Sequence, residues 1–295
     1  MNNGRKRLIK KATWVFRQTY KAILSRFDNY PYLSGDNIRK ICDITISKND
    51  LGLSKTKTRI ANSNSIFVEG HLLQDLIRYH AKSLEGKVVV SGNSDQNFLQ
   101  NPYFPDQPRL VICQNLAGYG NSRFKSLPIG IENLRLGRSG FKSLHKPLID
   151  FAVMDRILLP PMSPTNESRV RTRENARKRK DIFDIRDDFL RTSEYFELVR
   201  RYKFVFVCEG NGFDTHRLWE VLYQNSFPVI FKTEWAESLI WLNLPILMIS
   251  EMEELDNNLL ENHLRQFSLR QPRDYAALWM PFWVELINAK TTSEN

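Results

Sequence analysis

The stretch YKFVFVCEGNGFDTHRLWEVLYQNSFPVIF, Tyr202 to Phe231, decides the fold of this chain. Phe204 to Cys208 is a short apolar run rich in aromatic and β-branched residues, which is typical of a parallel strand covered on both faces. A glycine turn follows, and Asp214 or Thr215 then stands where a helix N-cap is expected. A second apolar run ends the stretch. This order predicts an open α/β sheet, in which ligands bind beyond the carboxyl ends of the strands.

The helix after the turn is predicted to have an apolar face that packs on the sheet and a polar face roughly opposite. At about 100° per residue, the apolar face holds Leu218, Val221 and Leu222, and the polar face holds His216, Arg217, Glu220 and Gln224. Arg217 can bind phosphate oxygens bidentately, and Glu220 can accept hydrogen bonds from sugar hydroxyls. A surface ion pair between the two explains the same spacing, and the sequence does not decide between these alternatives.

These residues resemble the donor-binding segment of exostosin-like glycosyltransferases. The matching positions are Phe204, Cys208, Gly210 to Gly212, Asp214 to Arg217, Trp219, Glu220 and Pro228 to Ile230. Two upstream segments are similar to the same family, ILLPPMSPTNESR at 157–169 and SLPIGIEN at 126–133. Glu209 departs from the family pattern, which often has Pro or Arg there, so the identity of the donor does not carry over.

The resemblance implies a GT-B-like α/β fold: two Rossmann-like domains facing a cleft, with a C-terminal helix packing back on the N-terminal domain. It also implies a nucleotide-sugar donor in the C-terminal domain. A hexose or pentose would pass with inversion to a saccharide or lipid-linked acceptor, as in polysaccharide biosynthesis. We expect no cofactor and no metal, because the chain lacks Asp-x-Asp and has cations to neutralise a diphosphate.

The predicted donor-binding residues follow the ends of two strands. They are Ser163, Asn166, Arg169, Arg173, Asn211, Gly212, Asp214, Thr215, His216, Arg217 and Glu220. The basic run RVRTRENARKRK, Arg169 to Lys180, is predicted to be a helix whose charges are mostly solvated, with Arg169 or Arg173 turned to the donor. If the strands are parallel, both loops lie at one sheet edge and can share a diphosphate.

Asp95 is the first candidate for the base that takes a proton from the acceptor. KVVVSGNSDQN, Lys87 to Asn97, reads as a buried strand running into a polar loop, which puts Asp95 at the carboxyl edge of the first sheet. An aspartate in such a loop also commonly serves only to hydrogen-bond the backbone. His71, at a predicted helix start, is the second candidate.

Length and composition indicate two domains of ordinary size. We expect a basic segment at 1–27, an N-terminal acceptor-side domain at 28–150, a C-terminal donor domain at 151–275, and a final helix and tail at 276–295. The boundary is predicted near 147–157, just before a strand at Arg156 to Leu159 that Pro160 and Pro161 end.

Residues 1–27 carry eight basic and no acidic side chains, with apolar residues at helical spacing. Such a segment either lies on an anionic membrane surface or packs on the N-terminal domain as a solvated helix. The longest uncharged apolar stretch, Ser238 to Ser250, is too short to span a bilayer. Three cysteines without paired spacing indicate a reducing compartment. We therefore expect a cytoplasmic protein that can be peripheral to the membrane.

The formal net charge of +10 makes a nucleic-acid-binding protein the main rival. The basic residues lie in two blocks without the interleaved aromatics that stack on bases, and no zinc-ligand spacing occurs. We therefore expect no nucleic-acid partner. A protein that binds sugar nucleotides without turning them over remains a second alternative, which nothing in the sequence excludes.

Overall fold

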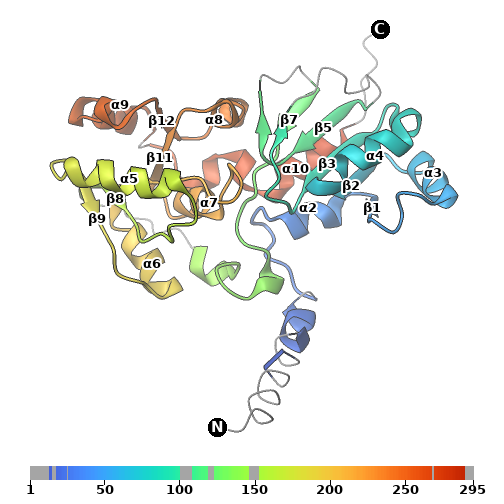
Figure 1. Ribbon diagram of the computed structural model, residues 1–295, viewed down its shortest axis with the longest axis horizontal. Coiled ribbons are helices and arrows are strands. Elements are labelled where there is room, and N and C mark those ends of the chain that lie inside the picture. Colours follow the sequence, from blue (N-terminus) through green and yellow to red (C-terminus); the bar gives the residue numbers. More distant parts are fainter. Residues whose placement is uncertain are drawn as a thin grey trace.

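In the computed structural model, the described residues are 13–14, 18–24, 26–99, 108–118, 123–145, 153–267 and 269–289. They form two five-stranded sheets in which all neighbouring strands are parallel. Figure 1 shows the sheets side by side, each with its own helices. We call the sheet built from residues 44–126, with the helices of residues 35–80, the N-terminal lobe, and the sheet built from residues 154–249, with the helices of residues 167–267, the C-terminal lobe. This α/β architecture agrees with the prediction of two Rossmann-like units.

The sheet of the N-terminal lobe has the strand order β1-β2-β3-β5-β7. Its strands are β1 (Ile44–Ile46), β2 (Ser65–Glu69), β3 (Val88–Gly92), β5 (Leu110–Cys113) and β7 (Phe124–Ser126). One face packs against α3 (Ser54–Ala61) and α4 (Leu73–His80), and the other against α2 (Gly35–Ile41) and α10 (Met280–Asn288).

Both faces of this sheet are buried, which explains its nearly continuous apolar strands. Successive side chains of a strand point to opposite faces. Val88 and Val90 accordingly join the hydrophobic cluster that contains α2 and α10, and Val89 joins the cluster that contains α3 and α4.

The sheet of the C-terminal lobe has the strand order β12-β11-β10-β8-β9. Its strands are β8 (Met154–Leu159), β9 (Phe183–Ile185), β10 (Tyr202–Phe206), β11 (Phe227–Phe231) and β12 (Leu247–Ile249). One face packs against α5 (Glu167–Lys178) and α9 (Asn257–Phe267), and the other against α6 (Thr192–Val199), α7 (His216–Tyr223) and α8 (Glu234–Glu237).

The chain reverses its direction across this sheet at β8. From β8 it crosses to β9 on one side and then returns to β10 on the other. The helices that follow β8 and β10, α5 and α7, therefore lie on opposite faces and leave a crevice between their N-termini. In open α/β sheets such a switch point is the usual place for a ligand.

The remaining elements are short. They are the paired strands β4 (Phe98–Leu99) and β6 (Leu116–Ala117), and the 3-10 helices η1 (Gly70–Leu72), η2 (Ala81–Leu84), η3 (Leu134–Leu136), η4 (Lys142–His145), η5 (Ile240–Leu242), η6 (Met252–Glu254), η7 (Pro272–Asp274) and η8 (Ala276–Leu278).

The C-terminal helix α10 packs back on the N-terminal lobe, as predicted, and lies between the two sheets in Figure 1. The N–H of Met280 donates to the carbonyl of Pro31 at 2.9 Å. Trp283 is fully buried, and its ring lies 5.9 Å from that of Trp241 in the C-terminal lobe. Pro281 stands in the first turn, so it begins this helix rather than interrupting it. One hydrophobic cluster thus contains residues of both sheets and of α10.

The predicted strands and helices match the structure to within a few residues, and the three cysteines are unpaired and buried. The predicted domain boundary falls mostly on residues 146–152, which lie outside the described part. Residues 1–12 and 15–17 of the basic N-terminal segment also lie outside it. The described residues 18–24 are helical, with Ile23 half exposed and Leu24 buried.

Candidate functional site

The crevice at the switch point is framed by the starts of α5 and α7. Asn166 is the N-cap of α5, and its Oδ1 accepts the N–H of Arg169 at 2.9 Å. Thr215 is the N-cap of α7 and makes no side-chain capping bond. Both helices begin at the carboxyl ends of neighbouring parallel strands, so their positive dipole ends face the same crevice.

A cleft of about 510 Å³ opens here, between the end of β8, helices α5 to α7 and the segment 132–139 of the N-terminal lobe. Four predicted donor-binding residues line it, namely Ser163, Arg169, Arg217 and Glu220. The loop after β8 and the helix after β10 therefore converge, as predicted from a parallel arrangement.

Arg169 is held at the cleft wall by backbone carbonyls rather than by carboxylates. Its Nε donates to the carbonyl of Glu209 at 2.7 Å, and its Nη1 to that of Ser163 at 3.3 Å. Burial lowers the pKa of Arg169, and the nearby positive charge of Arg217 lowers it further. An anion bound between these two guanidinium groups would relieve both effects.

Arg217 and Arg138 add two more guanidinium groups to the cleft lining. Arg217 lies over the ring of Tyr195, with its Cζ 5.2 Å from the ring centroid. Within the described part of the chain, neither they nor Arg169 have a carboxylate at ion-pair distance. Three cations that share one cleft without ion-pair partners form a site complementary to phosphate oxygens.

Glu220 lies on the face of α7 opposite its apolar residues, and this face is buried, which does not fit the alternative of a surface ion pair. Its exposed fraction is 7%, and that of Gln224, from the same predicted face, is 2%. The helix packs on the sheet on one side and on the N-terminal lobe on the other, so nearly every residue of it is covered. Burial raises the pKa of Glu220, and the neighbouring carboxylate of Glu132 acts in the same direction, against the opposing effects of Ser139, His216 and Arg217.

Glu132 shapes the part of the cleft that the N-terminal lobe contributes. Its Oε2 accepts the N–H of Arg138 at 3.2 Å and the N–H of Ser139 at 3.0 Å. This carboxylate therefore folds the chain back on itself and brings the Arg138 side chain to the cleft.

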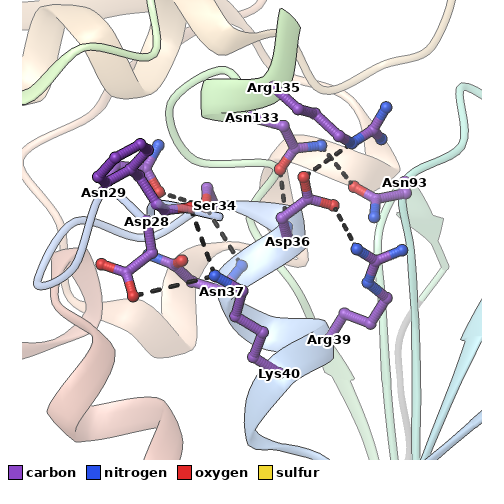
Figure 2. Close-up of polar contacts among 11 residues, drawn as sticks. Asp28, Asn29, Ser34, Asp36, Asn37, Arg39, Lys40, Asn93, Asn133 and Arg135 are labelled. Atoms are coloured by element: carbon purple, nitrogen blue, oxygen red, sulfur yellow. Dashed lines mark hydrogen bonds and ion pairs between the residues drawn. The ribbon is translucent and has the colours of Figure 1, made fainter. Parts of the chain in front are cut away.

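The same segment is anchored to the start of α2, as Figure 2 shows. The N–H of Asp36 donates to Oδ1 of Asn133 at 2.7 Å, and Nε of Arg135 donates to Oδ2 of Asp36 at 2.7 Å. Nδ2 of Asn133 then donates to Oδ1 of Asn93, just after β3, at 3.0 Å. These bonds fix the cleft wall relative to the edge of the N-terminal sheet.

The glycine turn docks on the N-terminal lobe instead of lining the cleft. A Cβ at Gly212 would lie 2.8 Å from the carbonyl oxygen of Asp95 and 3.0 Å from Nδ2 of Asn115. Glycine is therefore needed for this close approach. Nδ2 of the exposed Asn211 lies 3.4 Å from Oδ2 of Asp95.

Asp214 joins the two lobes. Its Oδ2 accepts the N–H of Ile129, its Oδ1 accepts Nε1–H of Trp219, and its own N–H donates to Oδ1 of Asn115, each at 2.7 Å. Burial raises its pKa to about 7, although both N–H bonds act in the opposite direction. The neighbouring His216 lies in the same contact, with Nδ1 2.8 Å from the carbonyl oxygen of Gly130.

The other predicted donor residues lie around the cleft rather than in its lining. Nδ2 of Asn166 donates to the carbonyl of Gly210 at 2.8 Å. Arg173 pairs with Asp187, and its pKa is lowered chiefly by burial. Thr215 lines a separate, mostly apolar cavity of about 140 Å³ beyond β10 and β11.

The candidate bases lie across the glycine turn from the cleft. Asp95 is exposed in the loop after β3, where the turn contacts it. His71, with 51% of its side chain exposed, lines a small pocket at the same sheet edge. Neither residue lines the 510 Å³ cleft.

Several cleft residues were missed by the sequence analysis. Arg138 and Ser139 come from the other lobe and carry no motif of their own. Tyr195 and Phe189 precede β10 in a segment dominated by charged residues. Phe189 is 96% exposed at the cleft, and an isolated aromatic side chain in so polar a run is the one signal that could have identified it.

Neither a protein-family profile nor a curated protein sequence matches this chain. Within the described ranges, no cluster of three or more histidine, cysteine, aspartate or glutamate residues is arranged to hold a metal ion. No helix among the same residues is both long enough and apolar enough to cross a membrane.

Proposed function

We propose that this protein is a glycosyltransferase with a GT-B arrangement, which transfers a sugar from a nucleotide-sugar donor to a saccharide or lipid-linked acceptor with inversion. The observation that carries the proposal is that Arg138, Arg169 and Arg217 converge at the switch point of the sheet. None of the three has an ion-pair partner among the described residues. The buried carboxylate of Glu220 lies beside them. A nucleotide diphosphate sugar needs both kinds of group, cations for its phosphates and an acceptor of hydrogen bonds for its ribose.

In this scheme the diphosphate lies between Arg169, Arg217 and the start of α5. Tyr195 faces the same space, and its buried hydroxyl lies beside Arg217, so it can donate to a phosphate oxygen that Arg217 also binds. Glu220 accepts from the ribose hydroxyls. The exposed ring of Phe189 offers a flat apolar surface for the base.

The reaction is a direct displacement at the anomeric carbon. A base on the N-terminal lobe, Asp95 or His71, takes the proton of the acceptor hydroxyl as the oxygen attacks, and the bond to the nucleotide diphosphate breaks. Negative charge gathers on the leaving phosphate. The guanidinium groups, already in place and partly desolvated, stabilise that charge in the transition state.

The test begins with melting temperatures measured against a panel of sugar nucleotides. A ligand at 100 times its dissociation constant stabilises the folded protein by about 2.7 kcal/mol. The best ligand is then titrated calorimetrically into wild type, Arg217→Ala and Glu220→Ala. We expect the dissociation constant of the Arg217 variant to rise by about 10-fold to 100-fold, because a charge-assisted bond contributes about 1.5–3 kcal/mol.

Arg171→Ala is the matched control, because Arg171 is exposed on α5 and does not line the cleft. It removes the same charge from the same lobe and should bind the donor like wild type. Glu220→Ala should weaken binding of the free nucleoside, which Arg217→Ala should leave unchanged. If both cleft variants bind like the control, the donor assignment is wrong. Donor binding without turnover of any acceptor would favour a non-catalytic sugar-nucleotide-binding protein.

A further inference from the structure

Gln114 carries a buried amide whose two polar atoms are without a hydrogen-bond partner among the described residues. It follows β5 at the carboxyl edge of the N-terminal sheet, and its backbone N–H donates to the carbonyl of Ser91 at 3.0 Å. The residue is 5% exposed. Neither Oε1 nor Nε2 makes a hydrogen bond within the described part of the chain. Leaving a buried amide unpaired is unfavourable, so a group that binds here gains two hydrogen bonds that the protein already presents.

The amide lines a pocket of about 60 Å³, which we call the Gln114 pocket. Its other described walls come from η1, the start of α4, the end of β3 and the chain from β3 into β4, and they include His71, Ser91, Ser94 and Phe98. A space of this size holds only a few water-sized groups. It is therefore a site for one edge of a molecule.

The chemistry of the lining points to a neutral, hydroxylated ligand. Apart from His71, the described lining residues carry no ionisable side chain. Among these described residues a phosphate or carboxylate would meet no lysine or arginine. The amide of Gln114 offers an acceptor and a donor side by side, which matches two neighbouring hydroxyl groups.

We propose that the Gln114 pocket binds two adjacent hydroxyl groups of a neutral sugar, the end of the acceptor saccharide. The identification of the bound sugar as the acceptor rests on the proposed glycosyl transfer. The binding of a sugar in this pocket does not depend on that proposal. Asn115 and Asp95, which the glycine turn contacts, are sequence neighbours of pocket residues. The turn therefore contacts both sites: Gly212 meets the loop beside the Gln114 pocket, and the carbonyl of Glu209 accepts Nε–H of Arg169 from the donor cleft.

Saturation-transfer NMR with methyl glycosides of glucose, galactose, mannose, xylose and N-acetylglucosamine tests this site directly. Gln114→Leu removes both polar atoms at nearly constant volume. We expect wild type to bind at least one glycoside and the variant to bind it about 10-fold or more weakly. The variant should melt at the same temperature as wild type or higher, because an apolar side chain suits a buried position without partners. Gln114→Met, of similar length, replaces it if the leucine variant fails to fold.

Gln266→Leu is the control, since Gln266 is exposed on α9 of the other lobe. It should bind glycosides like wild type. Equal binding by the Gln114 variant, or no glycoside bound by wild type, overturns the proposal.

Calorimetry with nucleoside diphosphates on the same proteins separates the two assignments. If the nucleotide and the sugar bind at distinct sites, Gln114→Leu should bind nucleoside diphosphates as tightly as wild type does. Glycoside binding that depends on Gln114, in a protein that binds no nucleotide, would refute the glycosyl transfer and leave the sugar site standing. Nucleotide binding without glycoside binding would refute the sugar site at Gln114 and leave the proposed donor site standing.

Discussion

Replacing Asp214 with asparagine tests whether burial or hydrogen bonding controls the charge of the carboxylate that joins the lobes. Both of its oxygens accept N–H groups, from Ile129 and Trp219, each at 2.7 Å. An asparagine has one oxygen, so one of those N–H groups loses its acceptor and faces an NH2 group. A buried donor left unpaired costs about 1–3 kcal/mol, and we expect the variant to be less stable than wild type by about that amount at pH 5.

The difference should shrink as pH rises. Burial raises the pKa of Asp214 to about 7 in the folded protein, whereas an aspartate in an unfolded chain titrates near pH 4, at about 3.9. The stability that the protonated group contributes is therefore fully present below the pKa of the unfolded chain, about 3.9, and is lost as pH rises through the pKa of the folded protein, about 7. At about 1.4 kcal/mol per pH unit, wild type loses about 3 kcal/mol relative to the variant between pH 5 and pH 7. The two proteins should be about equally stable by pH 8, or the variant should be the more stable.

Urea unfolding followed by tryptophan fluorescence at pH 5, 6, 7 and 8 measures these free energies. Asp155→Asn is the control, because Asp155 is 81% exposed and makes only a surface ion pair with Lys203. It should change the free energy of unfolding by less than about 1 kcal/mol at each pH. A difference between wild type and Asp214→Asn that stays constant from pH 5 to pH 8 would refute the reasoning, since the two N–H bonds would then outweigh burial and keep the carboxylate ionised.

Four further predictions concern the reaction and the N-terminus. Glu220→Gln should keep the protein folded, since burial raises the pKa of the Glu220 carboxyl. It should weaken nucleoside binding by about 10-fold. Unchanged binding in calorimetry would contradict the proposal that Glu220 binds the ribose. Asp95→Asn should lower turnover by about 100-fold or more with little change in donor affinity, and near-normal turnover would make His71→Gln the next variant to assay. Activity should survive EDTA; abolition by EDTA and recovery with Mn²⁺ or Mg²⁺ would show that the guanidinium groups are insufficient. Deleting residues 1–27 should reduce co-sedimentation with anionic vesicles more than activity in solution, and equal sedimentation of both proteins rules out this membrane role.

Much of the fold could be predicted from the sequence, because apolar runs and turn residues report local structure. β3, β8, β10 and β11 all coincide with predicted apolar runs. The burial of Glu220 could not be predicted in this way. A helical wheel assumes that one face is covered, whereas α7 is covered on both sides: Tyr223 accepts the N–H of Leu33 at 3.1 Å and donates to the carbonyl of Leu278.

The candidate site was predictable only where its residues follow strand ends. Ser163, Arg169 and Arg217 were found because parallel strands bring their carboxyl ends to one edge. Arg138 comes from the N-terminal lobe and depends on the contact between lobes, which no local pattern encodes. The sequence also predicted the glycine turn as a ligand loop, while its close approach to the other lobe became visible only in three dimensions.

The position of α10 has a consequence for how this chain folds during its synthesis. The helix covers one face of the first sheet, and Met280 bonds to Pro31, 249 residues earlier. At about 5–20 residues per second, a ribosome needs about 12–50 s to make that stretch. The last strand of the sheet ends at Ser126, 154 residues before Met280, so the finished first sheet keeps an apolar face without its final cover for about 8–31 s at this rate. A chaperone that binds nascent chains is therefore expected to remain on the early residues until the last helix leaves the ribosome.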